Sequence, residues 1–284
     1  GRGAQPLHVG AARSSRLAAR MLADGGASTG AGKKGSKRDG PEPEPYVDNW
    51  FDSLLVEYFR GKVEQELGRK MDGDKRGYDA VCEMTHLLNR ESGSPQVLQA
   101  RGKKILATLL PPWFAFVFGR FLKLFPGWFD ARHAAASVTF ALPWLVGRGK
   151  VVDVELEDGP MDDPRAVPSS AASWAVNAGY QPAGYKQGVL VEKCRLLDGT
   201  KCASVCVNVC KVPTEAFFNE QVGLPLTMVP DYETMECRFI FGKTPPPPSK
   251  DESFETPCLN ECPSVKFLRA MEEDRICRGI QVDS

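Results

Sequence analysis

The chain has 284 residues, which is enough for one or two domains with a sizeable hydrophobic core. Its 36 basic and 36 acidic residues cancel, so the chain as a whole lacks the excess positive charge that nucleic-acid binding requires. We therefore expect no nucleic-acid partner.

The first forty residues differ in composition from the rest of the chain. They contain eight Lys or Arg residues and two acidic residues, and they are rich in Ala, Gly and Ser. They also lack the central apolar run of a secretory signal. We expect residues 1–45 to be an organelle transit peptide followed by a flexible linker, the alternative being a disordered basic tail.

Two amphipathic helices are predicted after this linker. In residues 46–70 apolar side chains recur at helical spacing and form one wide face. The stretch GYDAVCEMTHLLNRE, residues 77–91, shows the same periodicity on one side. We therefore expect the chain to begin its fold with helices.

Residues 105–147 are the most apolar part of the chain. Prolines and the basic residues Arg120 and Lys123 interrupt this stretch, so a membrane-spanning helix is not expected. Broken apolar helices that carry Arg and Lys among aromatic residues suit either a core wall or a membrane-interface surface. The aromatic candidates for binding an apolar ligand are Trp113, Phe114, Phe118 and Phe121.

The periodicity changes at residue 151. VVDVELED alternates apolar and acidic residues as a half-buried strand does, and YKQGVLVEKCRLL and MECRFIFG also indicate strands. PTEAFFNEQVG predicts a short helix that ends at Gly223, and residues 257–277 a loop and a final helix. We predict an α+β protein with a helical, aromatic-rich region at 46–150 and a small cysteine-rich module at 151–284, for which a ferredoxin-like form is one option.

Cysteine is concentrated in that module. Eight of the nine cysteines follow residue 193, and Cys82 stands apart. Without a secretory signal, metal binding or redox chemistry is favoured over a disulfide framework. We expect Cys82 and Cys277 to be structural or unpaired.

The stretch KCASVCVNVCKVP places Cys202, Cys206 and Cys210 at two successive four-residue steps. In a straight α-helix the outer two would lie about 12 Å apart along the axis, so one metal centre could not take all three. A winding loop would bring them together, and two centres could share them. CLNECP adds Cys258 and Cys262, the second followed directly by proline, as in bacterial-type ferredoxins.

The spacing leaves the chemistry open. An iron–sulfur cluster is favoured over zinc, disulfides or merely buried thiols, with Cys194 and Cys237 as natural further ligands. A di-iron centre built on Glu83/His86 and Asp130/His133 is disfavoured, because such centres need further carboxylates from facing helices. No nucleophile elbow, phosphate-binding glycine loop or HExxH motif is present.

A longer pattern resembles a known family. The segment CVNVCKVPTEAFFNEQVGLPLTMVPDYETMECRFIFGKTPP, with ALPWLVG and GVLVEKCRLL before it, resembles the plastid β-carotene isomerases of the dwarf 27 type. The resemblance covers roughly residues 46–265 and is strongest over 186–246. It implies a plastid, iron-containing enzyme that interconverts all-trans- and 9-cis-β-carotene, the entry step to strigolactones.

The resemblance also implies a ligand set and partners. The matching positions are Cys194, Cys202, Cys206, Cys210 and Cys237, followed by Cys258 and Cys262. The expected cofactor is iron, and an iron–sulfur cluster is favoured over other forms of it. The expected partners are a polyene, the surface of a plastid membrane and an electron donor. The alternatives are a non-catalytic iron–sulfur electron carrier or plastid assembly factor, and a structural zinc module.

Overall fold

The structure is a computed structural model. It describes residues 43–70, 74–109, 111, 113–122, 124–125, 127–156, 166–167, 181–182, 184–262 and 280. Every described residue lies in one compact unit, residues 37–284. The described part combines helices with a small antiparallel sheet, which confirms the α+β prediction.

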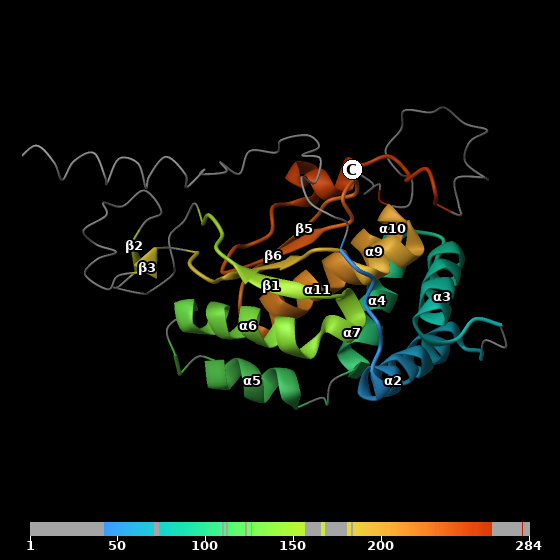
Figure 1. The fold of residues 1–284 in the computed structure, drawn as a ribbon, viewed down its shortest axis with the longest axis horizontal. Helices are drawn as coiled ribbons and strands as arrows, with labels where there is room; N and C mark the ends of the chain where they lie inside the picture. Colours follow the sequence, from blue (N-terminus) through green and yellow to red (C-terminus); the bar gives the residue numbers. More distant parts are fainter. Residues whose placement is uncertain are drawn as a thin grey trace, which may run out of the picture. The chain divides into compact units, whose positions relative to one another are not determined.

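Helices dominate the part of the chain before residue 147 (Figure 1). They are α2 (Trp50–Leu67), α3 (Gly77–Glu91), α4 (Pro95–Leu109), α5 (Phe114–Leu122), α6 (Gly127–Ala141) and α7 (Pro143–Val146). The two helices predicted for residues 46–70 and 77–91 are confirmed as α2 and α3. None of the described helices is both long enough and apolar enough to cross a bilayer.

The ends of α2 have clear local causes. The side chain of Asn49 accepts hydrogen bonds from the amides of Phe51 and Asp52, and the Asp52 carboxylate accepts one from the Asn49 amide, which forms a capping box. Gly68 ends the helix at a φ of 73°, a left-handed conformation that glycine adopts without strain. The helix packs on α3 and α4 around a core that includes Val56, Val63 and Met84.

The sheet has the strand order β1–β4–β6–β5, and all its pairs are antiparallel. The strands are β1 (Gly149–Val152), β4 (Gly188–Val191), β5 (Leu226–Pro230) and β6 (Cys237–Phe241). A separate parallel pair joins β2 (Ala166–Val167) and β3 (Gln181–Pro182). The strand predicted at MECRFIFG is therefore confirmed as β6, whereas the strand predicted at VVDVELED ends at Val152.

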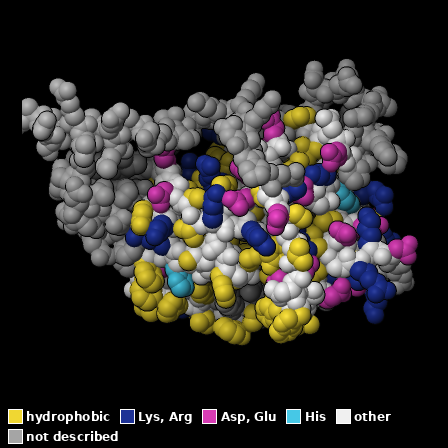
Figure 2. Space-filling model, in the orientation of Figure 1, with side chains coloured by type: hydrophobic (Ala, Val, Ile, Leu, Met, Phe, Trp, Pro, Cys, Tyr) yellow, Lys and Arg dark blue, Asp and Glu magenta, His cyan; other side chains and the backbone are white. Residues whose placement is uncertain are grey.

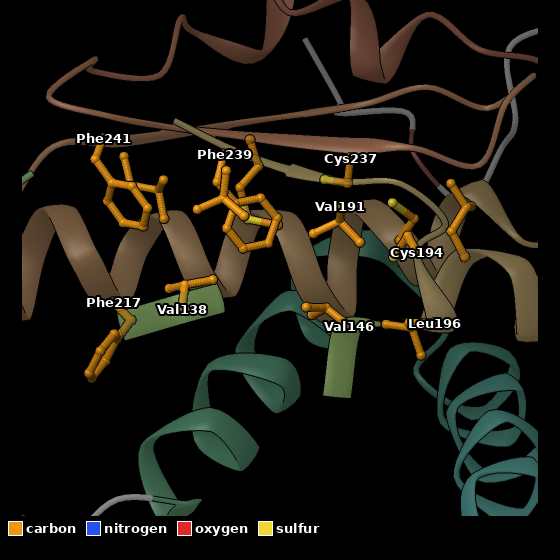
Figure 3. Close-up of a cluster of buried hydrophobic side chains, with 14 of the residues drawn as sticks. Val138, Val146, Val191, Cys194, Leu196, Phe217, Cys237, Phe239 and Phe241 are labelled. Carbon is orange, nitrogen blue, oxygen red and sulfur yellow. The ribbon is translucent and has the colours of Figure 1, made fainter. Parts of the chain in front are cut away.

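One face of the sheet packs against helices. In the register of the strands, Val191 pairs with Cys237 and Val189 pairs with Phe239, and all four side chains are buried. Figure 3 shows Val191, Cys237, Phe239 and Phe241 on the sheet side of this core, facing helical residues. The face therefore forms the wall of the main hydrophobic core, which α6 and the helical stretch after residue 202 close from the other side.

That helical stretch runs from residue 203 to residue 222. It contains α10 (Ala203–Val205), a π-helical segment (Cys206–Lys211), α11 (Val212–Ala216) and a second π-helical segment (Phe217–Val222). In the first segment the amide of Val212 donates to the carbonyl of Val207, five residues back, and Pro213, which has no amide hydrogen, follows directly. Gly223 ends the stretch at a φ of 78°, as predicted.

Some predictions need correction, and others lie outside the described part. Cys194 was expected within a strand, but β4 ends at Val191 and Cys194 instead precedes the short helix α9 (Arg195–Thr200). The winding loop considered for residues 201–211 is a helix. Two short 3₁₀ turns follow the sheet, Pro248–Lys250 and Glu252–Phe254. The transit peptide and the final helix fall largely on residues 1–42 and 263–279, outside the described residues.

Candidate functional site

Four cysteine side chains line one small cavity between the sheet and the helices. They come from different elements: Cys194 from the start of α9, Cys206 and Cys210 from the first π-helical segment, and Cys237 from β6. The other lining residues are Val146, Leu196, Leu197, Lys211, Met228, Pro230 and Phe239. The cavity has a volume of about 10 Å³, which is about the space that one water molecule needs.

Cys194 lies at the start of a helix. It is the residue directly before α9, and its side chain does not cap the helix. Figure 3 shows Cys194 and Cys237 at the same end of the core cluster. Burial raises the pKa of the Cys194 thiol, and the nearby amides of Leu197 and Leu196 lower it by less, so the net shift is upward.

The remaining three thiols are also kept protonated by their surroundings. Burial raises the pKa of Cys206 and of Cys237 well above the ordinary value, and the neighbouring thiols add to both shifts. Burial likewise raises the pKa of Cys210 to about 12, although Thr214 donates a hydrogen bond to it. At neutral pH the cavity therefore holds four neutral, polarisable thiols in an apolar wall.

A buried lysine closes one side of this cavity. The ammonium of Lys211, with only 1 % of the residue exposed, lies 2.7 Å from Glu215 Oε1 and 2.9 Å from Asp251 Oδ2, and donates to the Met228 carbonyl at 2.5 Å. Burial alone would lower the pKa of Lys211, but the two carboxylates raise it by more, so the pKa lies above its ordinary value. The cavity therefore has a buried ion cluster beside its thiols, in which Glu215 and Asp251 balance the charge of Lys211.

A chain of buried amides and a hydroxyl fixes the cysteine-bearing helix from its other side. Ser204 Oγ donates to Asn89 Oδ1 of α3 at 2.8 Å, and Asn208 Nδ2 donates to Ser204 Oγ at 3.2 Å. Gln99 Nε2 of α4 then donates to Asn208 Oδ1 at 2.8 Å. Because buried polar groups are costly to leave unpaired, this chain fixes the position and rotation of the helix that carries Cys206 and Cys210.

The other predicted ligands lie away from the cavity lining. Cys202 is one turn before Cys206, and Asn89 Nδ2 lies 3.8 Å from its sulfur. Cys258 and Cys262 follow the 3₁₀ turns and pack against the main core. Cys82 is buried in the core between α2, α3 and α4, as expected of a structural cysteine, while Cys277 lies outside the described residues.

The described side chains do not fit the expected metal. Within the part of the chain that the structure describes, no group of three or more His, Cys, Asp or Glu side chains is arranged to hold a metal ion. A cavity of about 10 Å³ also lacks room for an iron–sulfur cluster. The donor type suits a soft metal, but the arrangement does not support the predicted cluster.

The aromatic residues predicted to bind an apolar ligand differ in their exposure to solvent. Trp113 and Phe121 are exposed, with 61 % and 46 % of each residue accessible to solvent. Phe118 is half-buried and packs against the core cluster that contains three of the cavity thiols. The side chain of Phe114 is outside the described part of the structure.

The comparisons with known proteins point to one family. Residues 144–250 match the family model described as "Beta-carotene isomerase D27-like, C-terminal". This stretch is therefore similar to the D27-like C-terminal family. The resemblance predicted from the sequence motifs is therefore confirmed, and every residue that lines the cavity lies within the matched stretch.

Two curated relatives that carry this family name align with the chain over most of their length. The chain is 27 % identical over 225 residues to a protein of Medicago truncatula named "Beta-carotene isomerase D27, chloroplastic", covering 78 % of this chain and 76 % of the relative. It is 25 % identical over 224 residues to the Arabidopsis thaliana protein of the same name, with coverage of 77 % and 73 %. No solved structure gives a significant match.

Proposed function

We propose that the chain is a plastid isomerase that interconverts all-trans- and 9-cis-β-carotene reversibly, with its reactive centre at the four-thiol cavity. The isomerase class and the plastid location are supported by the names of both curated relatives. The observation that carries the position of the centre is that the whole cavity lining lies within the stretch matching the family model.

The reaction places few demands on acid–base groups. Rotation about a double bond of a polyene requires a temporary loss of double-bond order, and no atom leaves or enters the product. The cavity is lined by thiols and apolar side chains, and the ion cluster of Lys211, Glu215 and Asp251 lies beside it. A shortage of histidine therefore does not count against this activity.

The substrate is long and apolar, whereas the cavity is small and enclosed by side chains. We propose that the polyene reaches the thiols along the aromatic region before residue 147, with Trp113, Phe114, Phe118 and Phe121 as contacts. The half-buried position of Phe118 against the thiol-bearing core supports this path. The same argument leads us to propose peripheral contact with a plastid membrane, because carotenes dissolve in lipid.

Iron remains part of the proposal as a prediction from the sequence. Its ligands would come from Cys194, Cys202, Cys206, Cys210, Cys237, Cys258 and Cys262, and an electron donor would be its partner. No step of the isomerisation is assigned to it, because the described thiols are not arranged to hold a metal.

A carotene conversion assay separates the proposed isomerase from its alternative. The protein, purified without oxygen, is incubated with all-trans-β-carotene in detergent micelles, and the isomers are separated by chromatography. We expect the 9-cis isomer to appear, and the reverse conversion to start from 9-cis-β-carotene. If the pigment stays unchanged while the protein exchanges electrons with a reductant, the proposal fails and the electron carrier is favoured.

A further inference from the structure

The outward side of α5 is unusual for a helix on a protein surface. Apart from Arg120, the described side chains that are exposed on α5 and in the turns at either end are apolar: Trp113, Phe116, Val117, Phe121, Leu124 and Phe125. Phe116 and Leu124 are the most accessible of these, at 63 % and 77 % of each residue. A helix on the surface of a globular protein normally turns polar residues outward, so this face is predicted to have a partner.

The inward side explains why the apolar face cannot turn away from solvent. Gly119 faces the second π-helical segment so closely that a Cβ on it would lie 2.8 Å from the Val222 carbonyl oxygen. Phe118 packs against the main core on the same side. The helix is therefore fixed with its aromatic side outward, and Figure 2 shows hydrophobic side chains gathered along the edge where Figure 1 places α5 and α2.

The segment that forms this face carries basic residues and no acidic residue. Residues 113–125 include Arg120 and Lys123, whereas the basic residues of α4 before them are paired with Glu66 and Glu220. On α5 itself the charged side chain is Arg120, whose guanidinium lies 5.0 Å from the centre of the Phe116 ring. Arginine that lies on an aromatic ring in this way keeps its charge at the edge of an apolar surface, where a lipid phosphate can reach it.

We propose that this face, which we call the α5 face, binds the surface of a lipid bilayer that contains anionic lipids. Trp, Phe and Leu side chains enter the boundary between headgroups and acyl chains, and Arg120 contacts the headgroup phosphates. A second copy of the chain is the weaker candidate, because a two-fold interface would place the two copies of Arg120 close together. The purpose of this binding, the intake of a carotene from the membrane, rests on the proposed function, whereas the binding itself does not.

Vesicle sedimentation tests the face directly. The full chain is mixed with phosphatidylcholine vesicles, with or without phosphatidylglycerol, and the fraction that sediments is measured. The double variant Phe116→Ser/Leu124→Ser should lower partitioning to vesicles about tenfold or more. The control Val97→Ser/Val229→Ser removes two exposed apolar side chains elsewhere and should bind as the wild type does.

A charge reversal tests the headgroup contact separately. Arg120→Glu should weaken binding to the vesicles with phosphatidylglycerol and reduce its dependence on salt, whereas Arg238→Glu, an exposed site on β6, should change binding much less. Circular dichroism checks that each variant is folded.

Three results would overturn the proposal. They are a wild type that stays in solution with both vesicles, a double variant that binds like the wild type, and a wild-type dimer that the double variant converts to monomers. Carotene conversion in detergent micelles needs no bilayer, so failure of this proposal leaves the isomerase test unaffected.

Discussion

The ammonium nitrogen of Lys211 lies 2.9 Å from Oδ2 of Asp251, although the two residues are far apart in the sequence. The same ammonium contacts Glu215 one turn further along its helix. The contact between Lys211 and Asp251 joins the helix that carries Cys206 and Cys210 to the 3₁₀ turns that lead to Cys258. The buried ion pairs therefore hold one wall of the thiol cavity in place.

Removing this lysine should destabilise the protein strongly. Lys211→Met leaves the carboxylates of Glu215 and Asp251 buried without their cation, and breaking a buried pair in this way costs about 3–5 kcal/mol of unfolding free energy. Urea unfolding measures the loss.

The matched control is Lys150→Met, because Lys150 forms an exposed ion pair with Glu192 at 2.8 Å. Exposed pairs contribute about 0–1 kcal/mol, so this variant should unfold almost as the wild type does. Equal losses in the two variants would show that the buried pairs do not stabilise the cavity wall.

Gly102 marks the closest approach of α4 to the cysteine-bearing helix. A Cβ at this position would lie 2.8 Å from Pro213 Cγ and 3.1 Å from the Asn208 carbonyl oxygen. Gly102→Ala should therefore lower the unfolding free energy by about 1–3 kcal/mol through overpacking. Gly61→Ala in α2 meets no atom within 4 Å and should raise it by up to about 1 kcal/mol. A stabilised Gly102→Ala variant would contradict this packing.

The buried carboxyl of Asp130 should make the stability of the protein depend on pH. Its Oδ1 is buried without a hydrogen-bond partner among the described residues, and burial raises the pKa of this carboxyl from 3.8 to about 6. The folded state therefore binds this proton more tightly than the unfolded state does. The protonated carboxyl contributes its full share of the unfolding free energy below about pH 4, and this share is lost as the pH rises to about 6.

The Asp130→Asn variant should lack this decline. Thermal unfolding temperatures measured in steps between these pH values should fall less for Asp130→Asn than for the wild type. Asp74→Asn, which removes an exposed carboxylate, should keep the wild-type slope. A wild-type slope in Asp130→Asn would show that Asp130 does not titrate in this range.

Metal analysis tests the predicted iron by itself. If the sequence prediction is correct, protein purified without oxygen contains iron, the Cys206→Ser variant contains less, and Cys82→Ser retains the wild-type amount. Visible absorption then distinguishes an iron–sulfur cluster from a colourless zinc site. An iron-free, folded protein that still converts carotene would contradict the prediction.

Local elements were predictable where the sequence carries a local signal. The apolar periodicity of residues 77–91 predicts α3, and the alternation in MECRFIFG predicts β6 with Cys237 at its start. Helix α9 was missed because it has six residues and contains Gly199, which indicates a turn. The π-helical turns were not predictable, because a four-residue cysteine spacing indicates an ordinary α-helix equally well.

The thiol cavity depends on contacts that spacing does not encode. The proximity of Cys237 to Cys194 follows from the register of β4 with β6, and their proximity to Cys206 follows from packing of the sheet on the helix. Lys211 was missed as well, and its one sequence signal is an acidic residue four positions later. The sequence motifs placed seven cysteines in one predicted ligand set, whereas in the fold Cys202, Cys258 and Cys262 do not line the cavity.

The most direct test of the thiol cavity as the reactive centre compares two alanine variants of buried cysteines. Cys206→Ala removes a thiol from the cavity, and Cys82→Ala removes one from the core between α2, α3 and α4. Conversion of all-trans-β-carotene is measured for both, after unfolding curves show that each is folded. We predict that Cys82→Ala converts carotene as the wild type does and that Cys206→Ala does not. Conversion by Cys206→Ala at the wild-type rate would contradict the account.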